Sequence, residues 1–296
     1  MGAVVDGIAQ KDIPTIASAF RLADDVNNVV TATIDFAAAR DENARASGLN
    51  KLKEYDQDLR ATMTAIAATE GREKTIPIEN LRESIFVTLG HLDQALARGL
   101  HGAKQYRQRT EAVQTEYVTF LNVLMPWIKT AKGHFIDTTK AIFAQERDPN
   151  VLQRKVLRAS ILDMSLLQSL LEVQTAADLL NGLYGQVGTT RDSAVLERVR
   201  GQYAELRDRL LRSADLLPPG AERETLDQSL GRFLAAGREN EDGLFVLRAA
   251  MITTLHAQDK MLLDTQGLAT DLVRAIQKMV DETRVTLTAQ IEETLI

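Results

Sequence analysis

The 296-residue chain contains no cysteine, which excludes disulfide bonds, thiolate nucleophiles and thiolate zinc sites. It has only six prolines and 17 glycines, and aromatic residues make up 5% of it. These low counts disfavour sandwiches and barrels, because such folds need turn residues every few positions. Acidic residues outnumber lysine and arginine by 41 to 35, and this balance argues against nucleic acid as a partner.

Long uncharged apolar runs are missing as well. None approaches the roughly 18 residues of a membrane span, and the longest, near Phe120–Ile128, contains Pro126. The sequence shows no signal-peptide pattern. With 45% hydrophobic and 26% charged residues, its composition is typical of a folded protein that can bury a sizeable core.

Apolar residues recur at spacings of three and four along nearly the whole chain, which predicts an all-α protein without strands. The first stripe lies between Asp12 and Ala39 and consists of Ile13, Ile16, Phe20, Ala23, Val30, Ile34 and Ala37. A very long helix is expected to open at Pro77 and to continue through Pro126. The other predicted helices cover about 43–70, 152–184, 192–216, 221–237 and 243–293.

The helix lengths predict how the helices are grouped. Two are far longer than the rest, so each must pack against different partners at its two ends, and sustained heptads favour shallow packing angles. We therefore predict two stacked four-helix bundles that share long helices, with both chain ends at one end. One bundle would contain about 12–40, 110–145, 152–187 and 265–295, and the other about 43–109 and 192–264.

Catalytic signatures are absent from the sequence. It contains no Walker loop, nucleophile elbow, His-Glu-x-x-His motif or dinucleotide fingerprint. None of the histidines, His91, His101, His134 and His256, follows a glutamate at the spacing of a di-iron bundle. We predict that this segment is not an enzyme and holds no metal or cofactor. A haem ligated by histidine or methionine inside a bundle stays open as an alternative.

Polar residues interrupt the predicted apolar stripes. They are Arg248, Asp259 and Gln266 in the last helix, Asn27 in the first and Gln174 in the helix from residue 152. A buried polar residue needs hydrogen-bond partners, or it destabilises the bundle. Register control, a dimer contact and a ligand pocket between helices all account for such residues.

Counting helical rise from the shared end indicates which polar residues could meet. Gln266 is then level with Arg40, Tyr117 and Asn181 at the junction of the bundles, and Arg248 is level with Arg60 and His91. An arginine suits a carboxylate, because its guanidinium can bind both oxygens, and an aromatic ring suits a methylated amine. The predicted ligand contacts are Arg40, Arg60, Tyr117, Asn181, Arg248 and Gln266.

The C-terminal half carries a more specific pattern of apolar residues and turns. Its segments are Leu179–Tyr184, Val195–Arg200, Leu206–Leu217, Leu226–Leu234 and Gly237–Arg248, the last containing Gly-Leu-Phe-x-Leu-Arg. Together with the Ala-Ala-Arg that ends at Arg40, this succession resembles the helical bimodular sensor domains of bacterial transmembrane receptors. That family includes the sensor region of the trimethylamine N-oxide kinase TorS and the ligand-binding region of the chemoreceptor McpS.

The resemblance extends from about residue 12 to residue 293 and implies a periplasmic or extracellular sensor between two flanking transmembrane helices. It implies a homodimer, a membrane-proximal and a membrane-distal bundle, and a small helix shift that carries the signal. The implied ligand is a small organic acid, a methylated amine or a ligand-loaded periplasmic binding protein.

The parent protein is expected to be a sensor histidine kinase, with a chemoreceptor or a cyclic-dinucleotide enzyme as alternatives. A cytosolic helical scaffold or adaptor explains the heptads equally well, but it does not explain why the chain ends coincide.

Overall fold

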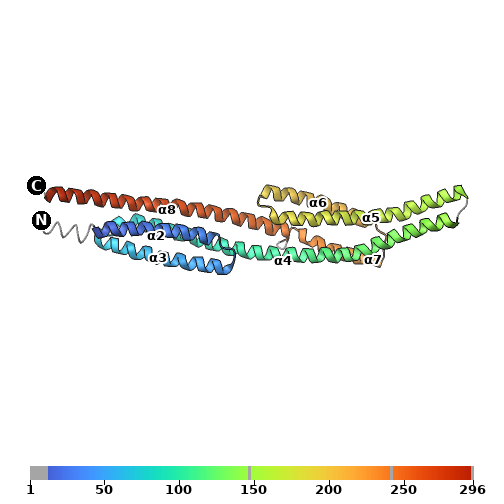
Figure 1. Cartoon of the computed structure of the whole chain (residues 1–296), viewed down its shortest axis with the longest axis horizontal. Helices are drawn as coiled ribbons and strands as arrows, with labels where there is room; N and C mark the ends of the chain where they lie inside the picture. Colours follow the sequence, from blue (N-terminus) through green and yellow to red (C-terminus); the bar gives the residue numbers. More distant parts are fainter. Residues whose placement is uncertain (1–12, 146–147, 241–242, 295–296) are drawn as a thin grey trace. The chain divides into compact units, whose positions relative to one another are not determined.

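The computed structural model describes residues 13–145, 148–240 and 243–294, and the regular structure in these ranges is entirely helical. The all-α prediction is therefore confirmed. Residues 12, 146–147, 241–242 and 295 of the predicted ranges lie outside the described residues. The elements along the chain are α2 (Ile13–Ala37), α3 (Glu42–Glu70), α4 (Arg72–Gln145), α5 (Pro149–Thr189), α6 (Ser193–Asp215), α7 (Ala221–Leu234), η2 (Ala235–Gly237) and α8 (Leu244–Thr294) (Figure 1).

Aspartate side chains begin three of these helices. Asp41, Asp148 and Asp192 accept hydrogen bonds of 2.7–2.8 Å from backbone N–H groups in the first turns of α3, α5 and α6. Gly71 ends α3 with a φ of 90°, a left-handed conformation that favours glycine. Because the chain re-enters a helix directly after Gly71, α4 begins at Arg72 and not at the predicted Pro77.

The chain forms two compact units, and α4 and α8 contribute to both. Unit 1 consists of the described residues up to His101 and from Thr253 onward, and unit 2 consists of Gly102–Ile252. Each unit has its own core of buried apolar residues. The prediction that two long helices are shared between two bundles is confirmed.

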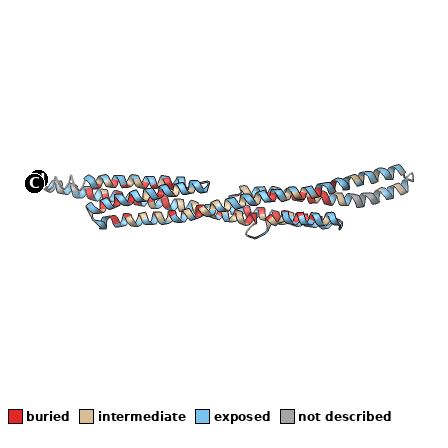
Figure 2. Cartoon of the chain, turned by 90° about the horizontal axis from the view of Figure 1, so that it is seen from below, coloured by how far each residue is buried: buried red, intermediate tan, exposed pale blue. Residues whose placement is uncertain are grey.

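In unit 1, α2 and α3 form an antiparallel hairpin that packs with α4 and α8. Thr15 Oγ1 donates to Thr69 Oγ1 at 3.0 Å, and Thr62 Oγ1 donates to an Asp25 carboxylate oxygen at 3.2 Å. At the other end of the hairpin, a Cβ added to Gly48 would lie 2.8 Å from the ring of Phe36. Figure 2 shows the buried residues on the inward sides of these helices.

The buried face of α2 differs from the predicted one. The residues of α2 that are buried in the core form a different stripe: Thr15, Ala19, Leu22, Val26, Val29, Thr33 and Phe36. From the predicted stripe, Ile13, Phe20 and Ile34 are 57%, 62% and 46% exposed. Both stripes have heptad spacing, so periodicity alone could not indicate which one α3 covers.

In unit 2, α4, α5 and α6 occupy three positions of a helical bundle. Two consecutive helices, α7 and the beginning of α8, share the fourth position. α7 supplies one part of this position, since the ring of Phe233 lies 5.6 Å from that of Tyr117 on α4. The first turns of α8 supply the other part of the fourth position, where Met251 lies against Gly102 of α4. Unit 2 is therefore also a four-helix bundle.

The predicted grouping of segments into bundles was wrong. Residues 13–37 share a core with α3, the first part of α4 and the last part of α8, and not with 110–145 and 152–187. The chain reverses direction between Ala37 and Glu42. The backbone N–H groups of Ala38 and Ala39 bond to carbonyl oxygens in the last turn of α2, and Asp41 caps the start of α3. The prediction treated this break as a continuation into the second bundle, and the later segments were misassigned in consequence.

Gly48→Ala tests the close contact between α2 and α3. Alanine is the better helix former by about 1 kcal/mol, but its Cβ would collide with Phe36, which is 1% exposed. We expect the free energy of unfolding to fall by about 1–3 kcal/mol in chemical denaturation. Gly90→Ala is the matched control, because that glycine of α4 is exposed with open space around it, and it should gain up to about 1 kcal/mol. Equal gains in both variants would contradict the packing.

Candidate functional site: a polar and aromatic cluster in unit 2

The segment Gly237–Arg248 connects α7 to α8, and its two glycines are required by close contacts. A Cβ at Gly237 would lie 2.0 Å from the ring of Tyr203, and a Cβ at Gly243 would lie 1.9 Å from the carbonyl oxygen of Arg238. Phe245, two residues farther along, packs its ring 5.3 Å from that of Tyr203. The described parts of the segment, 237–240 and 243–248, therefore pack closely, and Phe245 places the first turn of α8 against the core of unit 2.

Aromatic rings from four elements meet in this core. Tyr184 of α5 lies 5.6 Å from Tyr203 of α6 and 5.7 Å from Phe233 of α7, between ring centroids. Phe245 of α8 extends the group through Tyr203. All four side chains are at most 3% exposed. We call these residues, with Tyr106, Arg109, Arg200 and Arg248, the Tyr184 cluster.

Arg248 is buried in the cluster, as its place on an apolar stripe predicted. Its Nε donates a 2.7 Å hydrogen bond to the carbonyl oxygen of Thr190, the residue that caps the C-terminal end of α5. A cation at this end interacts favourably with the carbonyl groups that the helix leaves unpaired. Part of the role of Arg248 is thus to tie α8 to α5.

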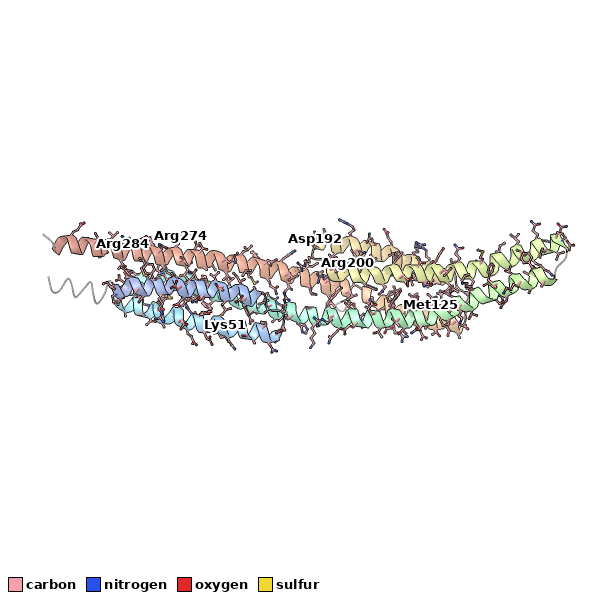
Figure 3. All side chains as sticks on the ribbon, viewed as in Figure 1. Lys51, Met125, Asp192, Arg200, Arg274 and Arg284 are labelled. Atoms are coloured by element: carbon pink, nitrogen blue, oxygen red, sulfur yellow. The ribbon has the colours of Figure 1, made fainter. Side chains whose placement is uncertain are left out.

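Four buried polar atoms of unit 2 have no hydrogen-bond partner among the described residues. They are Tyr106 Oη, Arg109 Nε, Tyr184 Oη and Arg200 Nε. Tyr106 borders Gly188 of α5, where an added Cβ would lie 3.2 Å from its hydroxyl oxygen. Arg200, which Figure 3 labels, pairs with Glu197 at 3.1 Å through another nitrogen. Its guanidinium lies 5.9 Å from the ring centroid of Phe245. Each such donor lowers stability unless a partner is supplied.

The protonation states make the cluster rich in hydrogen-bond donors. Burial raises the pKa of Tyr184, and the neighbouring Tyr203 raises it further. Burial likewise raises the pKa of Tyr106, an effect that the charge of Arg248 partly offsets. These phenols stay protonated at neutral pH, and guanidinium groups only donate. The arrangement suits a small molecule with acceptor oxygens, such as a carboxylate or an N-oxide.

Two further predicted contacts, Tyr117 and Asn181, lie beside the cluster on α4 and α5. The Tyr117 hydroxyl donates to Asp178, and Gln114 Nε2 donates to Asn181 Oδ1 at 3.0 Å. Burial, with the Asp178 carboxylate, raises the pKa of Tyr117 to about 12. The structure therefore brings Tyr117 and Asn181 to one interface, as predicted, although each is already paired.

The other predicted contacts belong to unit 1. Arg40 is exposed in the turn after α2, Arg60 is exposed and pairs with Asp56 at 3.0 Å, and Gln266 is half-buried on α8. Gln266 belongs to unit 1, whereas Tyr117 and Asn181 belong to unit 2. Arg60 and Arg248 likewise belong to different units, so no single unit contains either predicted grouping.

Arg248 is the one member of the cluster that sequence reasoning predicted as a ligand contact, and that reasoning missed all four residues with partnerless donors: Tyr106, Arg109, Tyr184 and Arg200. Tyr184 and Arg200 each end one of the segments that carry the resemblance, so the sequence held a signal for both. Tyr106 and Arg109 lie within the long helix α4, outside the segments that carry the resemblance, so nothing in the sequence singled them out. Within the ranges that the structure describes, no three histidine, aspartate or glutamate side chains are arranged to hold a metal ion.

Comparisons with known proteins bear on the fold. The sequence matches no protein-family model and no curated protein. Among solved structures, the TorS sensor domain from its complex with TorT in the presence of TMAO aligns with a TM-score of 0.79 and 12% identity, over 91% of this chain and 99% of that one. The TorS sensor domain of a V. parahaemolyticus histidine kinase aligns with a TM-score of 0.69 and 12% identity, over 90% and 99%.

The chain has the fold of these TorS domains. The expected resemblance is thereby confirmed at the level of architecture, with two helical bundles that share long helices. At 12% identity the likeness concerns the fold alone.

Tyr184→Phe tests the state of the buried phenol. Because its hydroxyl has no partner, we expect the variant to be at least as stable as the parent at pH 7. The folded pKa lies above the unfolded value of about 10, so the unfolded chain loses its proton first and stability falls as the pH rises past 10. The variant should lose less stability between pH 9 and 11 in thermal unfolding. Marked destabilisation at pH 7 would show that the hydroxyl is satisfied.

Proposed function

We propose that this chain is the sensor region of a bacterial transmembrane receptor, on the periplasmic or extracellular side of the membrane, and that the parent protein is a sensor histidine kinase. The observation that carries the proposal is the likeness to TorS sensor domains over nine-tenths of the chain. In this proposal the segment binds and transmits, and catalysis belongs to another part of the parent protein.

The arrangement of unit 1 supports a receptor. Ile16 in the first turns of α2 and Arg284 near the end of α8 line one groove, so the two helices reach the same end of this unit. A chain entering and leaving at one end suits a domain held between two membrane spans. Within the described residues, no helix is both long and apolar enough to cross a membrane.

The proposed signal is a shift in population between two packings of the Tyr184 cluster. α8 contributes Phe245 and Ile252 to the core of unit 2, and Ala269 and Ile276 to that of unit 1. A ligand biases the equilibrium only by its difference in affinity for the two packings. A change in how Arg248 and Phe245 pack would displace α8, which is continuous into unit 1.

The proposed ligand is a small organic acid or an oxidised methylated amine. Partnerless N–H and O–H donors of the cluster would bind its oxygens, and the rings of Tyr203, Phe233 and Phe245 would contact its apolar part. Ligand roles for Arg248, Tyr117 and Asn181 are part of this proposal. Arg40, Arg60 and Gln266 remain predicted contacts of a separate site in unit 1.

A ligand-loaded binding protein is a second way to deliver the signal. It is favoured by an exposed apolar stripe on α5, where Leu157, Ile161 and Met164 are 59%, 61% and 55% exposed. Met164 also borders a groove of about 300 Å³ that includes Leu171 and Arg209. The TorS domain that this chain resembles was solved in complex with TorT, which gives a precedent for a protein partner on this fold.

The parent gene separates a receptor from a soluble scaffold. We expect roughly 20 consecutive apolar residues on each side of the chain, followed after the second span by kinase sequence. A chemoreceptor or cyclic-dinucleotide output in that place would keep the sensor proposal and replace the kinase. Polar sequence on both sides would overturn the receptor and favour the helical scaffold.

Thermal unfolding with a panel of carboxylates and amine N-oxides tests the ligand. A compound present at about 100 times its dissociation constant should raise the free energy of unfolding by about 2.7 kcal/mol. Arg109→Gln should abolish this gain, and Arg198→Gln, which changes an exposed arginine of α6, should keep it.

The result distinguishes the proposed sites. Loss of the gain in Arg60→Gln but not in Arg109→Gln would move the ligand to unit 1. A gain that requires an added binding protein, and disappears in Ile161→Glu, would favour the protein-mediated form.

A further inference from the structure

The groove of about 300 Å³ between α5 and α6 in unit 2 combines apolar side chains with two opposite charges. Met164, Leu167 and Leu171 of α5 supply the apolar part. Glu172 of α5 supplies a carboxylate, and Arg209 of α6 supplies a guanidinium. A groove with apolar walls and a few convergent polar groups is typical of sites for small molecules, and this volume suits one such molecule.

Glu172 carries a charge that no described residue neutralises. One of its carboxylate oxygens accepts a hydrogen bond from Gln168 Nε2 at 3.2 Å, and the other accepts one from Ser213 Oγ at 3.2 Å. Both donors are neutral. A carboxylate has about four acceptor positions, so Glu172 can still accept hydrogen bonds from a cation. Because Ser213 is 4% exposed, its bond also fixes the Glu172 carboxylate against α6.

Arg209 has no anionic partner among the described residues either. Its side chain is exposed, and it does not pair with Glu172, although both line the same groove. A guanidinium group binds a carboxylate through two parallel hydrogen bonds, so Arg209 suits a ligand with that group. The groove thus presents an anion and a cation together, each without a partner of opposite charge.

The two charges define the class of molecule that fits. A simple carboxylate would be attracted by Arg209 and repelled by Glu172, and a simple amine would meet the opposite pair of effects. A molecule with an ammonium and a carboxylate group satisfies both residues at once. The three N–H donors of a primary ammonium match the open acceptor positions of Glu172, and an aliphatic side chain matches the apolar wall.

We propose that this groove is a second ligand site and that it binds an aliphatic amino acid. Glu172 accepts from the ammonium group, Arg209 donates to the carboxylate, and Leu167 and Leu171 contact the side chain. The site goes beyond the proposed function, because it shares no residue with the Tyr184 cluster, whose unpaired atoms are donors and cannot accept from an ammonium. The bound molecule would link α5 to α6, the helices that carry Tyr184 and Tyr203.

Calorimetric titration of the full 296-residue chain with leucine and its matched analogues tests the need for both charges. The compound 4-methylpentanoate lacks the ammonium group, and 3-methylbutylamine lacks the carboxylate. We expect leucine to bind at least about tenfold more tightly than either analogue, because each loses a hydrogen-bonded charge pair.

Two variants test the assigned residues. Glu172→Gln and Arg209→Gln should each weaken leucine binding by about tenfold or more, with helical content unchanged. Glu205→Gln and Arg198→Gln are the matched controls, since they make the same changes at exposed residues of α6 outside the groove, and they should leave the affinity unaltered.

The outcomes separate this site from the Tyr184 cluster. Leucine binding that is lost in Arg109→Gln and kept in Glu172→Gln would overturn the groove and assign the amino acid to the cluster. Equal affinity for leucine and 4-methylpentanoate, or no binding of leucine, valine and methionine, would also overturn it. None of these results alters the thermal response to carboxylates and N-oxides, which tests the proposed function on its own.

Discussion

The structure depends on two helices that each bury residues in two separate cores. α4 contributes Ile78 and Leu92 to unit 1 and Phe120 and Leu124 to unit 2, within one uninterrupted helix. α8 does the same in the opposite direction along the chain. Apolar burial is the main driving force for each core, so the register of these helices is fixed at two places by independent packing. A rearrangement of one core must therefore act on a helix that the other core also holds.

The Tyr184 cluster has an energetic cost that packing alone does not explain. A buried donor without a partner costs about 1–3 kcal/mol, and unit 2 keeps four such atoms. Apolar side chains of similar shape would fill the same space without that cost. Phenols and guanidinium groups retained in a core that is otherwise apolar are consistent with a site that a ligand completes.

Much of the architecture could be predicted from the sequence, and the failures have identifiable causes. Apolar residues spaced by three and four predicted the helices. The capping aspartates and Gly71 are recognisable in the sequence as signals for where helices begin and end. The grouping failed at residues 38–41, because periodicity records which face of a helix is apolar and not whether the next helix continues or turns back. For the site, Arg248 stood out as a charge on an apolar stripe. Tyr184 and Tyr203 did not, because buried tyrosines fit an apolar pattern and reveal their unpaired hydroxyls only after packing.

The position of α2 within unit 1 is fixed by its contacts with α3. Thr62 of α3 donates to Asp25 of α2, and Gly48 of α3 lies against Phe36 of α2. On another side of α2, Ile16, Phe20 and Ala23 line a groove whose opposite wall includes Val273 and Val280 of α8. Because α8 also contributes Phe245 to the core of unit 2, one helix borders both this groove and the Tyr184 cluster. A change in the packing of either core therefore acts on a helix whose register the other core also fixes.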